Sequence, residues 1–380
     1  MNTCLIIAGE KSGEEHCMSF FKDLKKLSPQ TIFWGVGGDA LKREGVEIIY
    51  HLQGFSTWGI SGVFGKIGFY YRALKKIKRM AVEKKCKTAI LIDFQTFNLI
   101  LAWMLKKKGI NILYYVAPQA WAWKAWRADI LKKVVHTLFT IIPFEKEWFT
   151  SRGVERVKSV THPLAITYRN ELDALENKNP DEIYRGFNKE INLLLLPGSR
   201  NFEVEELLPI FFESVIHLKK TNNVKIHLVK STSVNPQLYT QFEKNIDYAY
   251  FDDKLVYAFG KSDLCLAASG TVTLATALFQ LPTVICYKSS LLNEYIFRTM
   301  ISYRGPIGLA NIVHQEYVYP ELIQDQVSSY NIIRHLEKWI HNKSFFYQTK
   351  RELSDTKDKI LGEGLDVPKY MADILNEVKY

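Results

Sequence analysis

Two turns in this sequence carry residues suited to binding an anion. The turn PGSR (197–200) follows a run of four leucines, and the turn SGT (269–271) follows an apolar run near 263–267. Exposed backbone N–H groups at a helix start attract phosphate, and Arg200 could add two parallel hydrogen bonds to it. An ordinary turn with a solvated arginine would have the same residues, so PGSR alone leaves both interpretations open.

A carboxylate also lies directly after a predicted buried strand, as the two turns do. Asp93 directly follows the apolar run 89–92. A carboxylate at the carboxyl end of a parallel strand is a candidate general base, because ligands bind at that edge of a sheet. The alternative is that Asp93 caps a helix that begins near Phe97.

The segment GEKSGEEH (9–16) joins another apolar run, 3–8, to a helical pattern. It lacks the glycine spacing of a Rossmann dinucleotide site and the GK[ST] of a Walker loop, so neither site is predicted. Ser12 and Glu15 could form a capping box at the helix start. Alternatively, Gly9 and Gly13 could let a substrate approach the backbone closely.

Aromatic and basic residues crowd two further stretches. In 55–80, an apolar aromatic surface is followed by a basic cluster, which suits a helix lying on an anionic membrane. A core helix with a solvated basic end would show the same pattern. In 117–127, three tryptophans and two cations form an apolar, positively charged wall, which core packing explains only in part.

These residues require strands that end at one edge of a sheet. Apolar runs without polar alternation predict parallel strands that are buried on both faces. In 201–218, apolar residues at three- and four-residue steps predict a helix with acidic residues in its first turn. The expected strands are 3–8, 32–36, 89–93, 111–116, 138–142 and 157–160, then 193–197, 225–229, 248–251, 263–267 and 282–287.

Strand–turn–helix units alternate in two halves of the chain, which predicts two doubly wound α/β domains with a cleft between them. The expected domains are residues 1–168 and 191–354, joined by the polar linker 169–190. The last helix, 355–380, is expected to pack back on the N-terminal domain.

Composition narrows the class of protein. The chain has 380 residues, 47% of them hydrophobic and 24% charged, which is typical of a globular protein of two domains. Its net charge of +10 suits an anionic partner, but the lack of a block of like charges argues against nucleic acid. Five scattered cysteines without a C-x-x-C motif indicate a reducing compartment and no structural zinc, and Cys4, Cys265 and Cys286, which lie in apolar runs, are expected to be buried thiols. No signal peptide or membrane-spanning run is predicted.

Taken together, eight stretches resemble lipid-A-disaccharide synthases, a family of glycosyltransferases with the GT-B fold. Each stretch alone is a weak match, but all occur in the family's order along nearly the whole chain. They are AGEKSGEEH (8–16), GVGGDALKREGVE (35–47), LIDFQTFN (91–98), YYVAPQAWAWKAWR (114–127), IPFEKEWF (142–149), LLLLPGSRNFEVEELLP (193–209), AASGTVTLATAL (267–278) and GLANIV (308–313).

The resemblance implies a GT-B architecture, in which two doubly wound Rossmann-like domains face a central cleft. The C-terminal domain would bind UDP-2,3-diacylglucosamine and the N-terminal domain 2,3-diacylglucosamine 1-phosphate. An inverting displacement at the anomeric carbon would form the β-1,6-linked lipid A disaccharide phosphate and release UDP. The family implies no bound metal and no cofactor.

The resemblance also implies roles for individual residues. Asp93 matches the family's motif carboxylate and is expected to take the proton of the acceptor 6-hydroxyl, with His16 as a second candidate. The residues expected to hold the UDP-sugar are Gly198, Ser199, Arg200, Ser269, Gly270, Thr271 and Asn311. Those expected to contact the acceptor, its acyl chains or the membrane are Ser12, Gly13, Trp58, Phe64, Phe69, Tyr70, Arg72, Trp121, Trp123 and Trp126.

Several positions depart from the family's pattern. The first motif usually reads S-G-D, where this chain has Glu14. The Asp motif usually continues Pro-Asp-Phe, so Gln95-Thr96-Phe97 lacks one carboxylate. The helix after SGT usually carries a Glu, here Ala275, and the G-H-P motif with its following Asp has Thr161 and Ile166. These departures bear on substrate binding and activity rather than on the fold.

Two other functions stay open. One is another GT-B enzyme acting on a UDP-sugar, either a lipid glycosyltransferase or a UDP-N-acetylglucosamine epimerase, although an epimerase needs no acyl surface like 55–79. The other is a membrane-surface binding protein that lost the chemistry. Thr96 and Ala275 favour this second reading, whereas Asp93, Arg200 and Asn311 argue against it.

The family also implies where the chain works. It would be cytoplasmic in a Gram-negative bacterium, peripheral on the cytoplasmic face of the inner membrane, where lipopolysaccharide synthesis begins. Its expected partners are the two glycolipid substrates and an anionic membrane surface, with no nucleic acid. A homodimer is left open.

Overall fold

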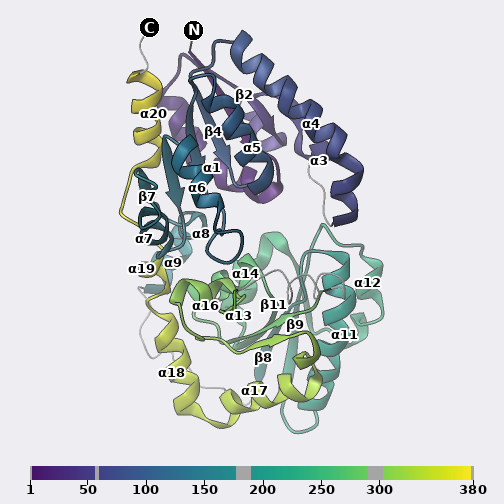
Figure 1. The fold of residues 1–380 in the computed structure, drawn as a ribbon. Helices are drawn as coiled ribbons and strands as arrows, with labels where there is room; N and C mark the ends of the chain where they lie inside the picture. The colour runs from purple at the N-terminus through teal and green to yellow at the C-terminus, as the bar shows by residue number, and fades with distance from the viewer. Residues whose placement is uncertain (1, 56–59, 177–189, 290–302, 378–380) are drawn as a thin grey trace. The chain divides into compact units, whose positions relative to one another are not determined.

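The computed structural model describes residues 2–55, 60–176, 190–289 and 303–377. The chain divides into two compact units (Figure 1). Unit 1 consists of Met1–Thr167 together with Ile360–Tyr380, and unit 2 consists of Tyr168–Lys359. Each unit is built around one parallel β-sheet with helices packed against it.

The sheet of unit 1 has the strand order β3-β2-β1-β4-β5-β6-β7. The chain order reverses between β1 and β4, and open α/β sheets bind ligands at such a switch point. Because both faces of the central strands are covered, β1 and β4 are buried almost throughout. The strands are β1 (Asn2–Ala8), β2 (Thr31–Gly37), β3 (Glu47–His51), β4 (Thr88–Ile92), β5 (Asn111–Tyr115), β6 (Thr137–Thr140) and β7 (Val157–Ser159).

The helices of unit 1 mostly connect successive strands. The helix α4 follows β3 by way of the short α3, and α20 comes from the far end of the chain. The helices are α1 (Lys11–Leu27), α2 (Asp39–Arg43), α3 (Leu52–Phe55), α4 (Ile60–Glu83), α5 (Gln95–Lys106), α6 (Arg127–Val134), α7 (Glu145–Thr150), α8 (Pro163–Thr167) and α20 (Val367–Glu377).

The sheet of unit 2 repeats this design with the order β10-β9-β8-β11-β12-β13, and its switch point lies between β8 and β11. Its strands are β8 (Ile191–Leu196), β9 (Val224–Lys230), β10 (Tyr248–Phe251), β11 (Leu264–Ala268), β12 (Thr283–Tyr287) and β13 (Glu321–Ile323). Its α-helices are α9 (Arg169–Glu176), α11 (Asn201–Leu218), α12 (Gln237–Thr240), α13 (Leu255–Lys261), α14 (Thr271–Leu278), α16 (Leu309–His314), α17 (Ser329–His341), α18 (Lys343–Leu353) and α19 (Thr356–Lys359), with 3-10 turns at Glu243–Asn245, Asp252–Lys254 and Gln324–Gln326.

The expected fold class is confirmed, and so is each expected strand within one or two residues. Two strands of the structure, β3 and β13, were not predicted from the sequence. The strand β3 lies at a sheet edge and none of its residues is fully buried, so its apolar signal is weak. The strand β13 has only three residues. The expected apolar face of α11 is buried from Val204 to Leu218.

The last part of the chain, from Ile360, packs on unit 1 as expected, but it is not one helix over 355–380, because the short α19 ends at Lys359 in unit 2 and α20 begins only at Val367. The helix α20 packs against α1 (Figure 1). The Asn2 side chain donates to the Leu375 carbonyl at 3.4 Å, and the His162 amide donates to the Ile360 carbonyl at 2.8 Å. Gly362 fits because a Cβ there would lie 2.5 Å from the Val160 carbonyl carbon. The stretch expected as a linker begins with α9, and its residues 177–189 lie outside the described part.

The five cysteines are buried free thiols, which confirms the prediction for Cys4, Cys265 and Cys286 and adds Cys17 and Cys86. Burial raises the pKa of the Cys17, Cys265 and Cys286 thiols far above the ordinary value. Among the described residues, no helix combines the length and apolarity that crossing a bilayer requires.

Candidate functional site

Asp93 and the PGSR and SGT turns lie at the two switch points. In unit 1, β1 and β4 pair up to Ala8 and Ile92, so the segment after Ala8 and the turn at Asp93 start from adjacent strand ends. In unit 2, β8 and β11 pair up to Leu196 and Ala267, which brings the PGSR and SGT turns to one edge. The predicted placement at carboxyl strand ends therefore holds in both sheets.

Asp93 sits in a strained turn between β4 and α5. Asp93 and Phe94 both have left-handed backbone angles, with φ of 46° and 44°, and Val116 after the neighbouring β5 has φ of 64°. Non-glycine residues adopt this region only when surrounding contacts hold them there. The Asp93 carbonyl accepts hydrogen bonds from Asn98 Nδ2 at 2.8 Å and from the Tyr114 hydroxyl at 2.9 Å. These hydrogen bonds hold the turn through the Asp93 carbonyl and do not involve the Asp93 carboxylate.

Burial shifts the Asp93 carboxyl toward neutrality. Desolvation raises its pKa to about 6, and the opposing hydrogen bond from the Phe94 amide is weaker. A carboxylate with this pKa is still mostly ionised at neutral pH but is more basic than a solvated one. It is therefore well matched to proton abstraction near neutral pH.

His16 lies in the second turn of α1. Burial lowers its pKa to about 4, so the imidazole is neutral at pH 7. Its Nδ1 is buried without a hydrogen-bond partner among the described residues. The ring meets that of His162 edge-on, with centroids 6.5 Å apart, and burial lowers the His162 pKa to about 3. A neutral imidazole with an open nitrogen can accept or relay a proton.

The glycine-bearing segment before His16 serves packing. A Cβ on Gly9 would lie 2.7 Å from the Phe94 ring, so that ring fills the space left for a substrate in the sequence-based hypothesis. A Cβ on Gly13 would lie 3.6 Å from the Ile92 carbonyl, which brings α1 close to β4. Ser12 does not cap the helix, because α1 begins at Lys11; its side chain is exposed in the first turn.

A carboxylate from the next turn occupies the PGSR turn. Gly198 has φ of 120°, a conformation that favours glycine, and a Cβ there would clash with Glu203 at 2.4 Å. The Ser199 amide donates to Glu203 Oε2 at 2.9 Å, and Arg200 Nη1 donates to Glu203 Oε1 at 2.8 Å. The sequence indicates an acidic first turn, but not that Glu203 occupies the donors expected to bind phosphate.

This arrangement predicts competition between Glu203 and a bound diphosphate. Glu203→Gln removes the negative charge, so we expect UDP to bind about two- to fivefold more tightly. Isothermal titration calorimetry with UDP measures the change. Glu205→Gln, on the same turn but exposed, is the matched control and should bind UDP like the parent chain. Weaker UDP binding by Glu203→Gln would instead make Glu203 a part of the binding site.

The SGT turn starts α14. The Ser269 hydroxyl donates to the Ile307 carbonyl at 3.3 Å, and the Ser269 amide donates to the Cys286 carbonyl at 2.9 Å. Gly270 and Thr271 are exposed at the helix start, and a Cβ on Gly270 would meet nothing within 4 Å. The exposed start of α14 is compatible with an anion, and Ser269 ties it to the segment before α16.

Asn311 acts within the protein. It is fully buried, its Nδ2 donates to the Tyr319 carbonyl at 2.9 Å and to Glu321 Oε1 at 2.8 Å, and its Oδ1 accepts from the Tyr319 amide at 2.9 Å. Glu321 in turn accepts from the Ile307 and Gly308 amides at 2.9 and 2.8 Å. Contacts within unit 2 thus replace the expected contact between Asn311 and substrate, and Asn311 holds the start of α16.

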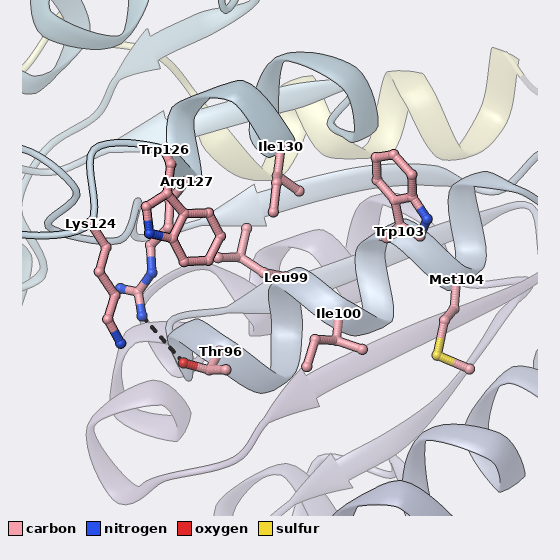
Figure 2. Close-up of a pocket in the computed structure, with 9 residues that line it drawn as sticks. All are labelled: Thr96, Leu99, Ile100, Trp103, Met104, Lys124, Trp126, Arg127 and Ile130. Carbon is pink, nitrogen blue, oxygen red and sulfur yellow. Dashed lines mark hydrogen bonds between the residues drawn. The ribbon is translucent and has the colours of Figure 1, made fainter.

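The three tryptophans of the loop before α6 have different surroundings. Trp121 Nε1 donates to the buried Glu145 at 2.9 Å, and burial raises the Glu145 pKa to about 7. Trp123 lies under two cations, Lys124 at 4.1 Å and Arg127 at 5.1 Å from its ring centre. Trp126 is 52% exposed and lines a groove (Figure 2). The three tryptophans therefore do not form one continuous wall: Trp121 bonds to a buried carboxyl, Trp123 contacts two cations, and Trp126 is exposed.

The aromatic residues of α4 also divide. Phe69 and Tyr70, expected at acyl chains or the membrane, pack instead against Phe55, and the Tyr70 hydroxyl donates to the Phe55 carbonyl at 2.6 Å. Arg72 is exposed, as are Tyr71 and several lysines beyond it. Trp58 and the Phe64 side chain lie outside the described part of the chain. Among residues that are described, no group of three His, Cys, Asp or Glu is arranged to hold a metal ion.

Comparison with known proteins now assigns the chain. A family model described as lipid-A-disaccharide synthetase matches residues 4–374. The chain belongs to this family. It is 31% identical to the lipid-A-disaccharide synthase of Nitrosococcus oceani over 369 residues, covering 94% of each chain. It is also 31% identical to that of Geobacter sulfurreducens, covering 95% of this chain and 93% of the other.

Solved structures with little sequence similarity share the fold. A UDP-GlcNAc 2-epimerase from Neisseria meningitidis, bound to UDP-GlcNAc, superposes with a TM-score of 0.58 at 10% identity, covering 99% of this chain and 100% of the other. A calicheamicin glycosyltransferase gives 0.57 at 13% identity, covering 99% and 98%. These proteins establish the GT-B fold of this family member.

Three departures from the lipid-A-disaccharide synthetase pattern have a defined structural setting. Glu14 is buried, and its Oε1 accepts from the Gly38 amide at 2.7 Å and the Leu41 amide at 2.9 Å, so it caps α2. Ala275 is buried within α14, so a carboxylate at this position would be buried as well. Thr161 donates to the Leu361 carbonyl at 2.7 Å and so fastens the C-terminal segment. Nothing in the structure explains Ile166.

Proposed function

We propose that this family member forms the lipid A disaccharide. It transfers 2,3-diacylglucosamine from its UDP derivative to the 6-hydroxyl of 2,3-diacylglucosamine 1-phosphate, with inversion at the anomeric carbon. The observation that carries the proposal is the family match over residues 4–374, which includes the turns at both switch points. The match covers both units, and this supports a reaction in which each unit binds one of the two substrates.

Asp93 is the proposed base. As the acceptor oxygen attacks the anomeric carbon, its hydroxyl proton passes to the Asp93 carboxylate and the bond from the anomeric carbon to UDP breaks. The strained turn holds Asp93 in place, and its raised pKa of about 6 makes the carboxylate a stronger base than a solvated one. The neutral His16 imidazole, whose Nδ1 has an open lone pair or proton, is the second candidate.

The departing UDP gains negative charge, and unit 2 supplies positive groups to stabilise it. The proposed donors are Arg200, the Ser199 amide and the exposed start of α14 at Gly270 and Thr271. Each such donor contributes about 3 kcal/mol when it is aimed at charge that develops in the transition state. Glu203 must leave Arg200 for this to happen, whereas Asn311 acts indirectly by positioning α16.

The chain is proposed to act at a membrane surface as a peripheral protein, because both substrates carry acyl chains. The part of α4 that supports this proposal is exposed and combines Ile67 and Tyr71 with Arg72, Lys75 and Lys76. Apolar side chains beside cations favour the interface of an anionic bilayer. We propose the cytoplasmic face of the inner membrane as its location, as the family implies, and a homodimer stays open.

An assay with both glycolipids tests the function. Purified protein is mixed with UDP-2,3-diacylglucosamine and 2,3-diacylglucosamine 1-phosphate in EDTA, and UDP and disaccharide are measured. We expect both products without added metal. No product from protein that still binds UDP would refute this acceptor or donor. No product and no UDP binding would favour a binding protein without catalysis.

UDP-N-acetylglucosamine in the same assay tests the epimerase alternative, which the fold shared with such enzymes raises. Conversion of this soluble sugar without an acceptor would favour an epimerase. We expect none, since the reaction proposed here requires acylated sugars.

A further inference from the structure

The turn between β4 and α5 holds Asp93 in a backbone conformation that its own residues do not favour. Asp93 and Phe94 follow one another with φ of 46° and 44°, and two consecutive non-glycine residues in this region cost free energy. A return of Asp93 to negative φ would redirect its Cα–Cβ bond, so the carboxylate would point elsewhere. The contacts that keep φ positive therefore also set the direction of the proposed base.

Tyr114 supplies one of these contacts from β5. Its side chain is fully buried, and its hydroxyl donates to the Asp93 carbonyl at 2.9 Å. A phenylalanine would fill the same core space, whereas a buried hydroxyl is costly unless it is hydrogen-bonded. Burial and the nearby Asp93 charge raise the Tyr114 pKa well above its ordinary value, so the hydroxyl keeps the proton that it donates.

Asn98 supplies the second contact from α5. It is fully buried, and its Nδ2 donates to the Ile92 carbonyl at 3.1 Å and to the Asp93 carbonyl at 2.8 Å. Because both partners are carbonyls, the amide nitrogen must face them, and Oδ1 is buried without a partner among the described residues. An apolar side chain would avoid this unpaired oxygen. The two bonds to the end of β4 and to the turn are thus what Asn98 adds at its position.

Arg127 holds the two residues after the turn. Its Nη1 donates to Gln95 Oε1, and its Nη2 donates to Thr96 Oγ1 at 3.2 Å, as Figure 2 shows for Thr96. Both partners are neutral, and in the part of the chain that the structure describes no carboxylate pairs with this buried guanidinium. Arg127 thus fixes side chains at the start of α5 but not the backbone of the turn, which leaves the Asp93 carbonyl to Tyr114 and Asn98.

We propose that Tyr114 and Asn98 are positioning residues for the glycosyl transfer: through the Asp93 carbonyl they keep the turn left-handed and aim the Asp93 carboxylate. Their effect on turnover rests on the proposed function, whereas their hold on the turn does not. Neither side chain needs to contact a substrate, because each acts through the backbone of Asp93.

Tyr114→Phe removes one hydroxyl and keeps the ring. With one of its two donors gone the turn loosens, so kcat for disaccharide formation should fall about tenfold. The KM values of both substrates should stay within about twofold of those of the parent chain, because no substrate contact is lost. The rate of UDP release gives both constants. An unchanged kcat would overturn the role of Tyr114.

Tyr115→Phe is the matched control. Tyr115 is buried on the opposite face of β5, and its hydroxyl bonds to Ser19 of α1. The same chemical change one residue away should lower the melting temperature as Tyr114→Phe does, but kcat should stay within about twofold of the parent value. An equal loss of kcat in both variants would indicate general loosening of unit 1 and overturn the proposal.

A double-mutant cycle tests whether the two residues act through Asp93. In the Asp93→Asn background, Tyr114→Phe should change the residual rate by less than about twofold, because the base is already lost. Asn98→Ala should lower kcat of the parent chain at least about tenfold and should lose its effect in the same background. Equal losses in both backgrounds would mean that these side chains act independently of Asp93, which would overturn the proposal.

Hydrogen exchange tests the hold on the turn without any substrate. The Asp93 amide donates to the Tyr115 carbonyl at 3.0 Å, and the Asn98 amide donates to the Phe94 carbonyl at 3.1 Å. Both amides should exchange at least about fivefold faster in Tyr114→Phe than in the parent chain, and at the parent rate in Tyr115→Phe. Parental exchange in Tyr114→Phe would overturn the proposal whether or not the chain forms the disaccharide. If the parent chain forms no disaccharide but the variants show the expected exchange, the hold on the turn is supported and the proposed function fails.

Discussion

Asp93→Asn should lower kcat for disaccharide formation by about two to four orders of magnitude, which is the usual contribution of a positioned general base. The amide keeps the size of the side chain but cannot take the acceptor proton. UDP release measured at saturating substrates gives kcat, and UDP titration should be unchanged because Asp93 lies in the other unit. Turnover within about threefold of the parent chain would remove Asp93 from the role of base.

The pH profile provides an independent test of the same carboxylate. Because burial raises the Asp93 pKa to about 6, the base form is lost as the pH falls through that value. We expect kcat/KM to fall about tenfold for each pH unit below 6, and Asp93→Asn to lack this inflection. His16→Gln is the control: its imidazole titrates at about 4, so it cannot cause an inflection near 6.

Stability distinguishes a catalytic Asp93 from a structural one. A carboxyl whose folded pKa lies above its unfolded value stabilises the fold at low pH and loses that contribution as the pH rises through 6. Its ionised form is therefore unfavourable for folding at pH 7, and Asp93→Asn should raise the melting temperature there. A clear drop in melting temperature would indicate a structural role.

Arg200→Ala should slow turnover by about two to three orders of magnitude and weaken UDP binding, if Arg200 stabilises the leaving diphosphate. The Arg200 side chain is 54% exposed and forms an ion pair with the nearby Glu203, and exposed ion pairs contribute little to stability, so the melting temperature should change little. Steady-state kinetics and UDP titration measure the two effects.

Arg200→Lys is the matched control for geometry. It keeps the charge but loses the planar fork that grips two phosphate oxygens, so its rate should lie between those of the parent chain and Arg200→Ala. The double variant Arg200→Ala/Glu203→Gln tests how Glu203 acts. If its turnover rate is no lower than that of Arg200→Ala, the Glu203 carboxylate acts only through Arg200. Normal kinetics for Arg200→Ala would exclude it from the site.

Much of the fold could be predicted because parallel strands have a distinctive pattern. The leucines before Pro197 do not alternate with polar residues, since both faces of β8 are covered, and the same holds for β4 before Asp93. The edge strand β3 escaped prediction because its half-buried residues give no such run. The sequence thus predicts central strands well and sheet edges poorly.

The site was predictable only to the level of strand ends. Asp93 and Arg200 follow central strands, so their location could be inferred from order alone. Their partners could not, because pairing depends on side-chain direction. The sequence predicts Glu203 only as part of an acidic first turn, yet its carboxylate accepts a hydrogen bond from Arg200. The sequence predicts that Asn311 contacts substrate, yet its amide is hydrogen-bonded to Tyr319 and Glu321.

The groove shows a further limit. Trp103 lies in α5 and Trp126 lies in the loop before α6, so no single sequence pattern joins them. One signal was available: Thr96 stands where the family usually has a carboxylate. Its consequence, an unpaired Arg127 charge, requires the contact seen between α5 and α6.

The connection of residues 360–377 with unit 1 has a consequence for biosynthesis. Unit 1 begins with β1, but α20 lies against α1, and the carbonyl of Leu375 accepts from Asn2. A ribosome makes all of unit 2 between these two parts, so unit 2 can fold during translation while the nascent unit 1 still lacks a helix. The domain that emerges first is completed last, and a nascent chain arrested before residue 360 would expose the surface of α1 to chaperones and proteases.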